Sequence, residues 1–389
     1  MKRGWEVKRL GDVCELYQPK TISTKEMVDG GEFPVFGANG IIGRYNEYNH
    51  EEPQLLITCR GATCGSVNIT EPKSWINGNA MVVRPIDESL NLEFIKFLFI
   101  GGIDIQKTIT GAAQPQITRQ TLSPVLIPLP PLKEQQRIVA ILDEAFAAIA
   151  QAKANAEQNL KNAKELFESY LQSVFENKGE GWEEKTLGEM IELLVGFAFK
   201  SKNYTEVEDD ILLLRGDNIM QGYLRLDDVK RWSKLEFEIY KKYQLQENDI
   251  LLAMDRPWVK AGLKIAKISN KNIPALLVQR TACLRTKSNL DNSFLFYLLK
   301  ANGFMKYLID VQTGIGVPHI SGKQILDFSF TTPSLKEQQD IAQKLDALSV
   351  ETKQLEAIYQ QKINDLDELK KSILQKAFAG ELKTTALVA

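Results

Sequence analysis

The chain has 389 residues, of which 44 % are hydrophobic and 25 % charged, as in ordinary globular proteins. Its net charge of −2 excludes a protein that coats nucleic acid through bulk basicity. No apolar run approaches the length of about 18 residues that a membrane helix needs, and the first residues show no secretion signal. We therefore expect a cytoplasmic protein, with reduced thiols and no metal site, because the four cysteines lack the spacing of zinc ligands.

Residues 1–131 are predicted to form a mixed α/β domain. Short apolar runs at 54–58 and 80–84 are bounded by Gly, Pro and Asn, which is typical of strands. Aromatic and leucine side chains between 91 and 100 have helical spacing. Several prolines between 124 and 131 predict an extended connector, because Pro disfavours helix before it.

A long helix is predicted next, within 132–178. Residues 133–175 contain neither Pro nor Gly, and apolar residues recur with a period of 3.5, which indicates a coiled-coil seam. At about 1.5 Å per residue the helix is roughly 65 Å long and cannot bury its apolar stripe alone. The predicted seam residues are Leu142, Phe146, Ile149, Leu160 and Phe167.

Residues 179–334 are predicted to form a second mixed α/β domain. The window 225–287 holds fourteen Lys and Arg against seven Asp and Glu, with four Trp and Tyr side chains between them. Such a window suits a phosphate-binding face, and it also suits an ordinary solvated surface; both interpretations stay open.

A second long helix is predicted within 335–380, before a tail at 381–389. Its predicted seam residues are Leu345, Leu348, Leu355, Tyr359, Leu366 and Ile373. Since a whole domain joins the two helices, they should pair antiparallel. With their ends aligned, Lys153 would lie about one turn from Glu356, and this pair could fix the register; the alternative is that Lys153 extends to water.

The chain is a tandem duplication. A Leu-Lys-Glu-Gln-Gln box at 132–136 recurs at 335–339, and a Gly-Trp box at 4–5 recurs at 181–182. The Gly-Trp boxes are 177 residues apart and the other boxes 203, so the second globular part is 26 residues longer. The ends of the modules match while their middles differ, which indicates one scaffold that presents two surfaces. We expect Trp5 and Trp182 to anchor the helix ends, with Trp5 close to Gly380.

These motifs resemble a known family. The Leu-Lys-Glu-Gln-Gln boxes, the Pro-Leu-Pro-Pro segment at 128–131 and the closing segment 372–382 are similar to those of specificity subunits of type I restriction–modification enzymes, as are the Gln-Pro-Gln-Ile and Val-Pro-His-Ile boxes. The resemblance covers the whole chain. It implies an α+β fold in which a long antiparallel two-helix coiled coil separates two mixed α/β target recognition domains, in a circular arrangement with pseudo-two-fold symmetry.

The resemblance also implies a function. Such a subunit carries no catalysis and no cofactor; each recognition domain reads one half of a bipartite double-stranded DNA target. The coiled coil sets the spacing and docks two modification subunits, which bind S-adenosylmethionine and methylate adenine. Two restriction subunits, which use ATP and Mg²⁺, complete the complex.

Base readout needs side chains such as Arg, Asn and Gln on loops, and neighbouring glycines allow close approach of the backbone. In the first domain the candidates are Asn39, Arg44, Tyr45, Arg60, Asn77 and Asn79. In the second they are Arg215, Asn218, Arg256, Lys260, Gln279 and Arg280. His319 stands where the other half has Gln116, so a structural or a base-edge role fits it better than catalysis.

The same residues bear on other classes of protein. No P-loop and no nucleophile elbow is present, and two histidines are too few for most acid–base sites, which argues against an enzyme. A coiled-coil scaffold that joins protein partners remains an alternative, as does the specificity subunit of a system that only methylates.

Overall fold

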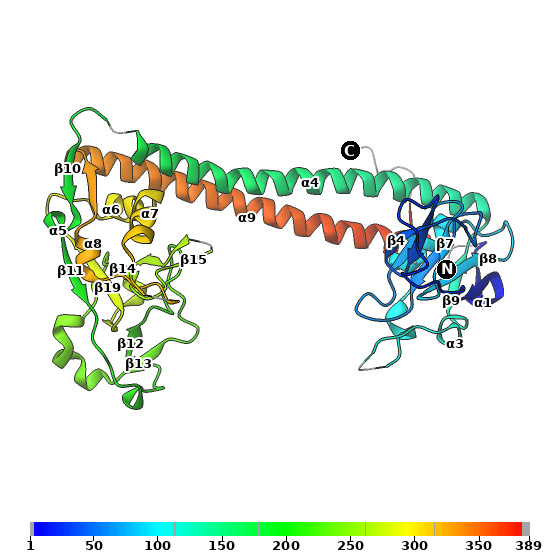
Figure 1. The fold of residues 1–389 in the computed structure, drawn as a ribbon, viewed down its shortest axis with the longest axis horizontal. Coiled ribbons are helices and arrows are strands. Elements are labelled where there is room, and N and C mark those ends of the chain that lie inside the picture. The colour runs from blue at the N-terminus through cyan, green and yellow to red at the C-terminus, as the bar shows by residue number, and fades with distance from the viewer. Residues whose placement is uncertain (1–3, 112–113, 178, 261, 315, 383–389) are drawn as a thin grey trace. The chain divides into compact units, whose positions relative to one another are not determined.

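The computed structural model of the chain describes residues 4–111, 114–177, 179–260, 262–314 and 316–382 (Figure 1). It divides into two compact units. Unit 1 comprises Met1–Gln158 and Tyr359–Ala389, and unit 2 comprises Asn159–Ile358. Most of the predicted tail lies outside the described residues.

The sheets of unit 1 are a four-stranded antiparallel sheet of order β2-β8-β5-β6 and a three-stranded sheet of order β4-β3-β7. A separate ladder, β1-β9, ties the N-terminal segment to the strand before the long helix. The strands are β1 (Glu6–Arg9), β2 (Cys14–Tyr17), β3 (Phe33–Gly37), β4 (Gly40–Tyr45), β5 (Leu55–Thr58), β6 (Val67–Ile69), β7 (Trp75–Ile76), β8 (Ala80–Pro85) and β9 (Leu126–Leu129). The short helices are α1 (Leu10–Val13), α2 (Leu92–Phe97), η1 (Leu98–Gly102), η2 (Ile105–Thr108) and α3 (Arg119–Leu122).

The core of unit 1 joins its sheet to both long helices. Phe94 of α2 is fully buried in a cluster that also holds Leu142 and Leu374, one from each long helix. Trp5 and Phe378 pack against the same cluster. The N-terminal segment and the end of the second helix therefore share one core, as the repeat predicted.

Unit 2 repeats this topology. Its four-stranded sheet has the order β11-β19-β14-β17 and its three-stranded sheet the order β13-β12-β18, with a β10-β20 ladder and a β15-β16 hairpin. The strands are β10 (Glu183–Thr186), β11 (Ile191–Val195), β12 (Ile211–Leu214), β13 (Lys230–Trp232), β14 (Ile250–Ala253), β15 (Trp258–Val259), β16 (Gly262–Leu263), β17 (Ile265–Lys267), β18 (Ala275–Leu277), β19 (Thr281–Thr286) and β20 (Ser329–Thr332). The short helices are α5 (Leu187–Met190), η3 (Ser201–Asn203), η4 (Lys234–Tyr243), η5 (Asn270–Asn272), α6 (Asn292–Lys300), α7 (Asn302–Val311) and α8 (Gly322–Leu326).

The strand registers give each residue of one sheet an equivalent in the other. Val83 pairs with Leu16 and Leu55 on its two sides. Leu284 pairs in the same way with Leu193 and Ile250. The parallel pairs β3-β7 and β12-β18 match as well, since three residues lie between the end of each second strand and the start of the next strand.

Most of the extra length of the second globular part lies in one connection. The chain advances 19 residues from Phe36 to Leu55, and 36 residues from the equivalent Leu214 to Ile250. The longer connection carries the 3₁₀ helix η4, inside the basic window 225–287.

The two long helices are α4 (Leu132–Glu176) and α9 (Leu335–Ala379), which confirms the strongest prediction from sequence (Figure 1). They are antiparallel within each unit. In unit 1 Arg137 donates to the carbonyl oxygen of Leu382, and the ammonium of Lys370 lies 4.7 Å from the ring centre of Phe146. In unit 2 Phe167 and Leu345 share one buried cluster.

The predicted partner of Lys153 is wrong. The ion-pair partner of Lys153 is Asp367, whose Oδ1 lies 2.7 Å from Lys153 Nζ. A helical side chain leans toward the N-terminus of its own helix. In an antiparallel pair, Lys153 therefore reaches toward the C-terminal end of α9.

One predicted seam residue is also wrong. Leu355 is 38 % exposed, while Thr352 is 2 % exposed and occupies the buried stripe. Its hydroxyl donates to the carbonyl oxygen of Leu348, so the polar group is satisfied within the helix. Buried residues of the two seams include Ile138, Leu142, Ala145, Ile149, Ala156, Ala163, Phe167, Leu171, Ala342, Leu345, Leu374 and Ala377.

Candidate nucleic-acid interface

A groove of about 520 Å³ lies at one edge of the sheets of unit 2. It is formed where β12 and β14 end and where β19 begins, and four of the six candidates in this domain line it. The lining residues are Tyr204, Arg215, Gly216, Asp217, Asp255, Arg256, Lys264, Val278, Gln279, Arg280 and Val317. We call this surface the second edge.

Asp255 organises one side of the second edge. One carboxylate oxygen lies 2.9 Å from Arg280 Nη1, and the other lies 2.5 Å from His319 Nδ1. The backbone of His319 is held in turn by bridges to Asp255 and Thr313. A single carboxylate therefore orients a guanidinium, which remains 71 % exposed, and an imidazole.

Two arginines of the second edge have unusual backbone conformations. Arg256 has φ of +45° and Arg280 has φ of +63°, a region that L side chains rarely adopt. Across the residues that the structure describes, two further non-glycine residues have positive φ, Lys73 and Asn248. Backbone outliers of this kind concentrate at functional sites, where the surrounding structure holds them in place.

Lys264 belongs to the second edge although sequence reasoning missed it. It directly precedes a short buried strand, and its ammonium reaches the groove. Burial lowers the pKa of Lys264, and the nearby cations Arg225 and Arg256 lower that pKa further. The carboxylate of Asp217 acts in the opposite direction. The basic window 225–287 was the only signal that could have found this lysine.

The equivalent loops of unit 1 form a surface that we call the first edge. The strand registers place Asn39, Arg60 and Asn79 where the second edge has Asp217, Asp255 and Arg280. Thr58 at the end of β5 donates to Asn39 Oδ1 at 3.1 Å, and Arg60 bridges to Gln116 through the backbone. Three separate loops thus meet at this edge as well.

Two candidates are buried structural residues. Asn77 is 2 % exposed, and its amide group exchanges hydrogen bonds with the backbone of Ile22. Asn218 is 3 % exposed; its amide accepts from the backbone of Arg215 and donates to that of Arg225. Since both side chains are occupied and enclosed, we withdraw them as candidates for base contact.

The remaining candidates lie away from the two edges. Arg44 on β4 donates to the carbonyl oxygens of Gly31 and Glu32, so its guanidinium is already engaged. Tyr45 packs edge-on against Trp75. Lys260 is exposed beside the β15-β16 hairpin and does not line the groove.

The chain matches known proteins over almost its whole length. The family model described as type I restriction modification DNA specificity domain matches residues 2–162 and 179–365. This chain belongs to that family. It is the DNA specificity subunit of a type I restriction–modification system, and therefore the non-catalytic part of that enzyme, with no cofactor of its own.

Individual relatives agree with the family match. The chain is 25 % identical to the type I restriction enzyme MjaVIII specificity subunit of Methanocaldococcus jannaschii, over 98 % of this chain and 94 % of that protein. It is 39 % identical to the EcoAI specificity subunit of Escherichia coli over 43 % of this chain and 28 % of that protein.

Solved structures show the same fold at low sequence identity. A chain from a structure describing the assembly and conformational transition of a type I restriction–modification system superposes with a TM-score of 0.75 at 18 % identity, and covers 98 % of this chain and 99 % of that one. The specificity subunit of Thermoanaerobacter tengcongensis superposes with a TM-score of 0.66 at 19 % identity, with 98 % of each chain covered.

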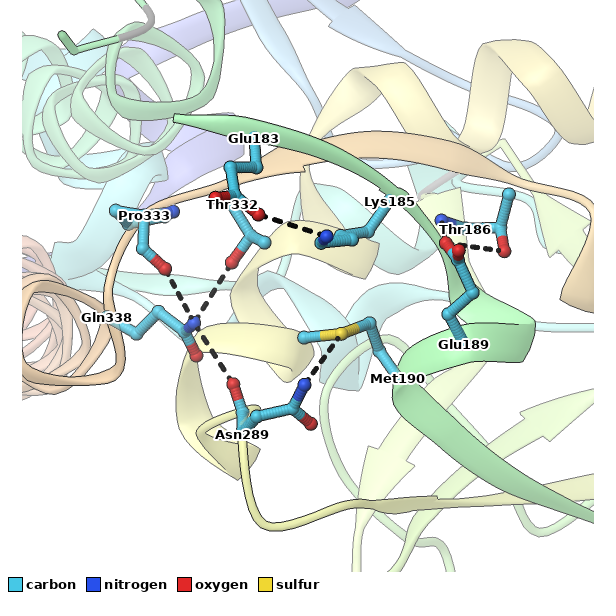
Figure 2. A network of polar contacts seen from close by, with 9 residues as sticks. All are labelled: Glu183, Lys185, Thr186, Glu189, Met190, Asn289, Thr332, Pro333 and Gln338. Atoms are coloured by element: carbon cyan, nitrogen blue, oxygen red, sulfur yellow. Dashed lines mark hydrogen bonds and ion pairs between the residues drawn. The ribbon is translucent and has the colours of Figure 1, made fainter. Parts of the chain in front are cut away.

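The repeated Leu-Lys-Glu-Gln-Gln box of this specificity subunit has a structural role, which Figure 2 shows for its second copy. Gln338 is 1 % exposed, and its amide donates to the carbonyl oxygens of Pro333 at 2.9 Å and Asn289 at 3.4 Å. It also donates to the Thr332 hydroxyl at 3.0 Å. Its amide oxygen accepts from the backbone of Asp291, the N-cap of α6. The glutamine thus links the start of α9 to the globular part beneath it.

Gln135 makes the equivalent contacts in unit 1. It is fully buried, donates to the carbonyl oxygens of Ser89 and Pro130, and accepts from the backbone of Asn91, the N-cap of α2. We call these two contacts the glutamine latches. Trp182 also anchors the second helix, since its indole donates to Glu337 at 3.1 Å and its ring packs against Phe294.

The described residues offer no alternative site for metal chemistry. Among them, no group of three or more His, Cys, Asp or Glu side chains could hold a metal ion. Nor does any helix in this part of the chain have the length and apolarity to cross a membrane.

Proposed function

We propose that each globular part of this specificity subunit reads one half of a bipartite double-stranded DNA target through its edge. The observation that carries this proposal is the contrast between fold and edge. The two globular parts share strand order and register, yet their exposed side chains differ at equivalent edge positions. The equivalent pairs are Arg60 and Asp255, Asn79 and Arg280, and Gln116 and His319.

The chemistry of these residues suits base readout. Arg pairs with guanine, Asn and Gln pair with adenine, and a carboxylate accepts from cytosine in the major groove. The Asp255 carboxylate holds the Arg280 guanidinium in one orientation, as specific readout requires. Different side chains on the same scaffold would let one chain recognise two different half-sites.

The long helices would then set the distance between the half-sites and dock two modification subunits. In this proposal those subunits bind S-adenosylmethionine and methylate adenine, and two restriction subunits supply ATP- and Mg²⁺-dependent cleavage. The complex would act in the cytoplasm. Exposed apolar residues on the helices, such as Leu166, Val350 and Ile358, support a role for α4 and α9 as docking surfaces.

Methylome sequencing of a strain that carries this chain with its modification subunit tests the proposal. We expect a bipartite adenine-methylation motif. Arg280→Ala should relax or change one half of the motif, and Asn79→Ala should change only the other half. Each good bidentate contact is worth about 1–3 kcal/mol of discrimination.

Lys271→Ala is the matched control. Lys271 is exposed on η5, at the end of the sheet opposite the second edge. Its substitution should leave both halves of the methylation motif unchanged. A continuous motif, or an edge variant that alters both halves together, would contradict the proposal. Absence of any DNA preference in the presence of the modification subunit would favour the scaffold alternative.

A further inference from the structure

Three cations line the second edge without a carboxylate partner of their own. Among the residues that the structure describes, Arg215, Arg256 and Lys264 form no ion pair with Asp or Glu. The Nε atom of Arg215 is buried and has no hydrogen-bond partner. The Nη2 atom of the same guanidinium donates to the Asp228 carbonyl oxygen at 3.4 Å, so Arg215 is held by a backbone contact and not by a carboxylate.

The carboxylates nearby do not balance this charge. Asp255 is already engaged by Arg280 and His319. Asp217 is exposed and lies near Lys264. Its backbone carbonyl oxygen accepts a hydrogen bond from Arg225 at 3.2 Å, which adds a further cation to the site. Lys230 and, less strongly, Arg215 and Arg225 lower the pKa of Asp228, but its carboxylate is ion-paired with Lys230 at 2.8 Å. The groove therefore keeps an excess of positive charge, which favours a bound anion.

The groove is also open beside the lysine. A Cβ atom placed on Gly216 would lie 4.0 Å from Lys264 Nζ, so the absence of a side chain at Gly216 leaves space next to the ammonium. Guanidinium groups and an ammonium around one small space are the donors that proteins use for phosphate.

The first edge has none of these three cations. The strand registers place Gly37, Gly61 and Ser66 at the positions of Arg215, Arg256 and Lys264. The backbone matches too, because Gly61 and Arg256 both have positive φ and both donate to a proline carbonyl. The backbone N–H of Thr58 donates to the carbonyl oxygen of Ser66, and the backbone N–H of Ala253 donates in the same way to the carbonyl oxygen of Lys264.

We propose that Arg215, Arg256 and Lys264 bind a backbone phosphate of the DNA, and that this phosphate site exists in the second globular part and not in the first. The proposal rests on the proposed function, because it assumes that the second edge faces DNA. It separates two tasks within that edge: these three cations hold the duplex in place, while Arg280 and its neighbours read bases.

A triple variant that gives the second edge the composition of the first tests this site. Arg215→Gly, Arg256→Gly and Lys264→Ser introduce the residues that the equivalent backbone of unit 1 already carries. The complex of the full chain with its modification subunit is titrated with target DNA at several salt concentrations. The slope of log K against log salt is negative, and loss of one phosphate contact should make it less steep by about 0.9. The methylated motif should stay the same, since phosphate contacts carry no sequence information.

Lys271→Ser is the control. It removes an exposed lysine far from the edge and should leave the slope unchanged. A triple variant with the wild-type slope overturns the phosphate site. So does a triple variant with a changed motif, because these residues would then read bases. Neither result affects the proposed function, which is tested separately by the motif of the wild-type complex and by the single edge variants Arg280→Ala and Asn79→Ala.

Inorganic phosphate distinguishes DNA from a free anion as the ligand. In the absence of DNA, chloride is replaced by phosphate at equal ionic strength. The resulting change in melting temperature should be the same for the wild type and the triple variant. A larger stabilisation of the wild type, together with an unchanged salt slope, would identify a free-phosphate site and overturn DNA as its ligand.

Discussion

The glutamine latches and the two edges show opposite degrees of repetition. At the latches, Gln135 and Gln338 make three equivalent hydrogen bonds, and Gln338 adds a fourth to the Thr332 hydroxyl. At the edges, small residues of unit 1 occupy the backbone positions that carry cations in unit 2. The buried geometry of a latch leaves no freedom for substitution, whereas an edge loop contributes little to the core.

This difference separates the scaffold of the specificity subunit from its variable surface. A latch holds a helix start, a proline connector and the N-cap of a core helix together. Loss of the glutamine would remove the hydrogen bonds that join the start of the long helix to the globular part. Edge residues can change without such a consequence, which suits the proposed reading of two different half-sites by one scaffold.

The largest expected effect comes from breaking a latch. Gln338→Ala removes four hydrogen bonds and leaves buried partners unsatisfied, which should destabilise unit 2 by about 3 kcal/mol. Gln135→Ala should cost unit 1 a similar amount. Urea denaturation, with hydrogen exchange at the amides of Asn91 and Asp291, measures the two losses separately.

The neighbouring glutamines are matched controls. Gln136 and Gln339 are exposed, so their substitution by Ala should change stability by less than about 0.5 kcal/mol. If only one latch variant destabilised its unit, the two latches would not be equivalent, and the repeated box would need another explanation.

A smaller effect of opposite sign is expected at the edges. Arg256→Gly relieves a left-handed backbone and should leave stability unchanged or raise it by about 0.5 kcal/mol. The reciprocal Gly61→Arg should cost about 1 kcal/mol, because φ at Gly61 is +85°. Thermal unfolding of the two variants measures both changes.

This pair of variants sharpens the contrast between edge and latch. A loss of stability in Arg256→Gly comparable to that of a latch variant would show that the second edge is part of the scaffold. Equal stability with weaker DNA binding would separate the function of the residue from its role in the fold.

Much of this architecture could be predicted from the sequence, because repeated boxes and a 3.5-residue period are local signals. The edge loops could be located too, since glycine-bounded strands predict where strands end; Arg60 and Arg280 were found in this way. Asn77 and Asn218 were wrong, because an amide that satisfies a buried backbone looks the same in sequence as one on an exposed loop. Lys264 was missed because a lysine next to a short strand has no distinctive pattern.

The helix pair shows the same limit. The seam pattern favoured Leu355 by hydrophobicity, yet Thr352 is buried and its hydroxyl is satisfied by the preceding turn. The register was wrong for Lys153 because aligned helix ends ignore the direction in which side chains lean. Pairing across a coil depends on the packing of small residues such as Ala156, which carry little signal of their own.

The smallest expected effect tests that register in unit 1. Lys153 and Asp367 are partly exposed, so their ion pair should contribute a coupling free energy of only about 0.5 kcal/mol. A double-mutant cycle with Lys153→Met and Asp367→Asn measures it by denaturant unfolding at low salt, and added salt should weaken it. The control cycle pairs Lys153→Met with Glu356→Gln and should show no coupling. Coupling to Glu356 instead of Asp367 would mean that the helices align by their ends, and that the antiparallel pair is shifted from the arrangement described above.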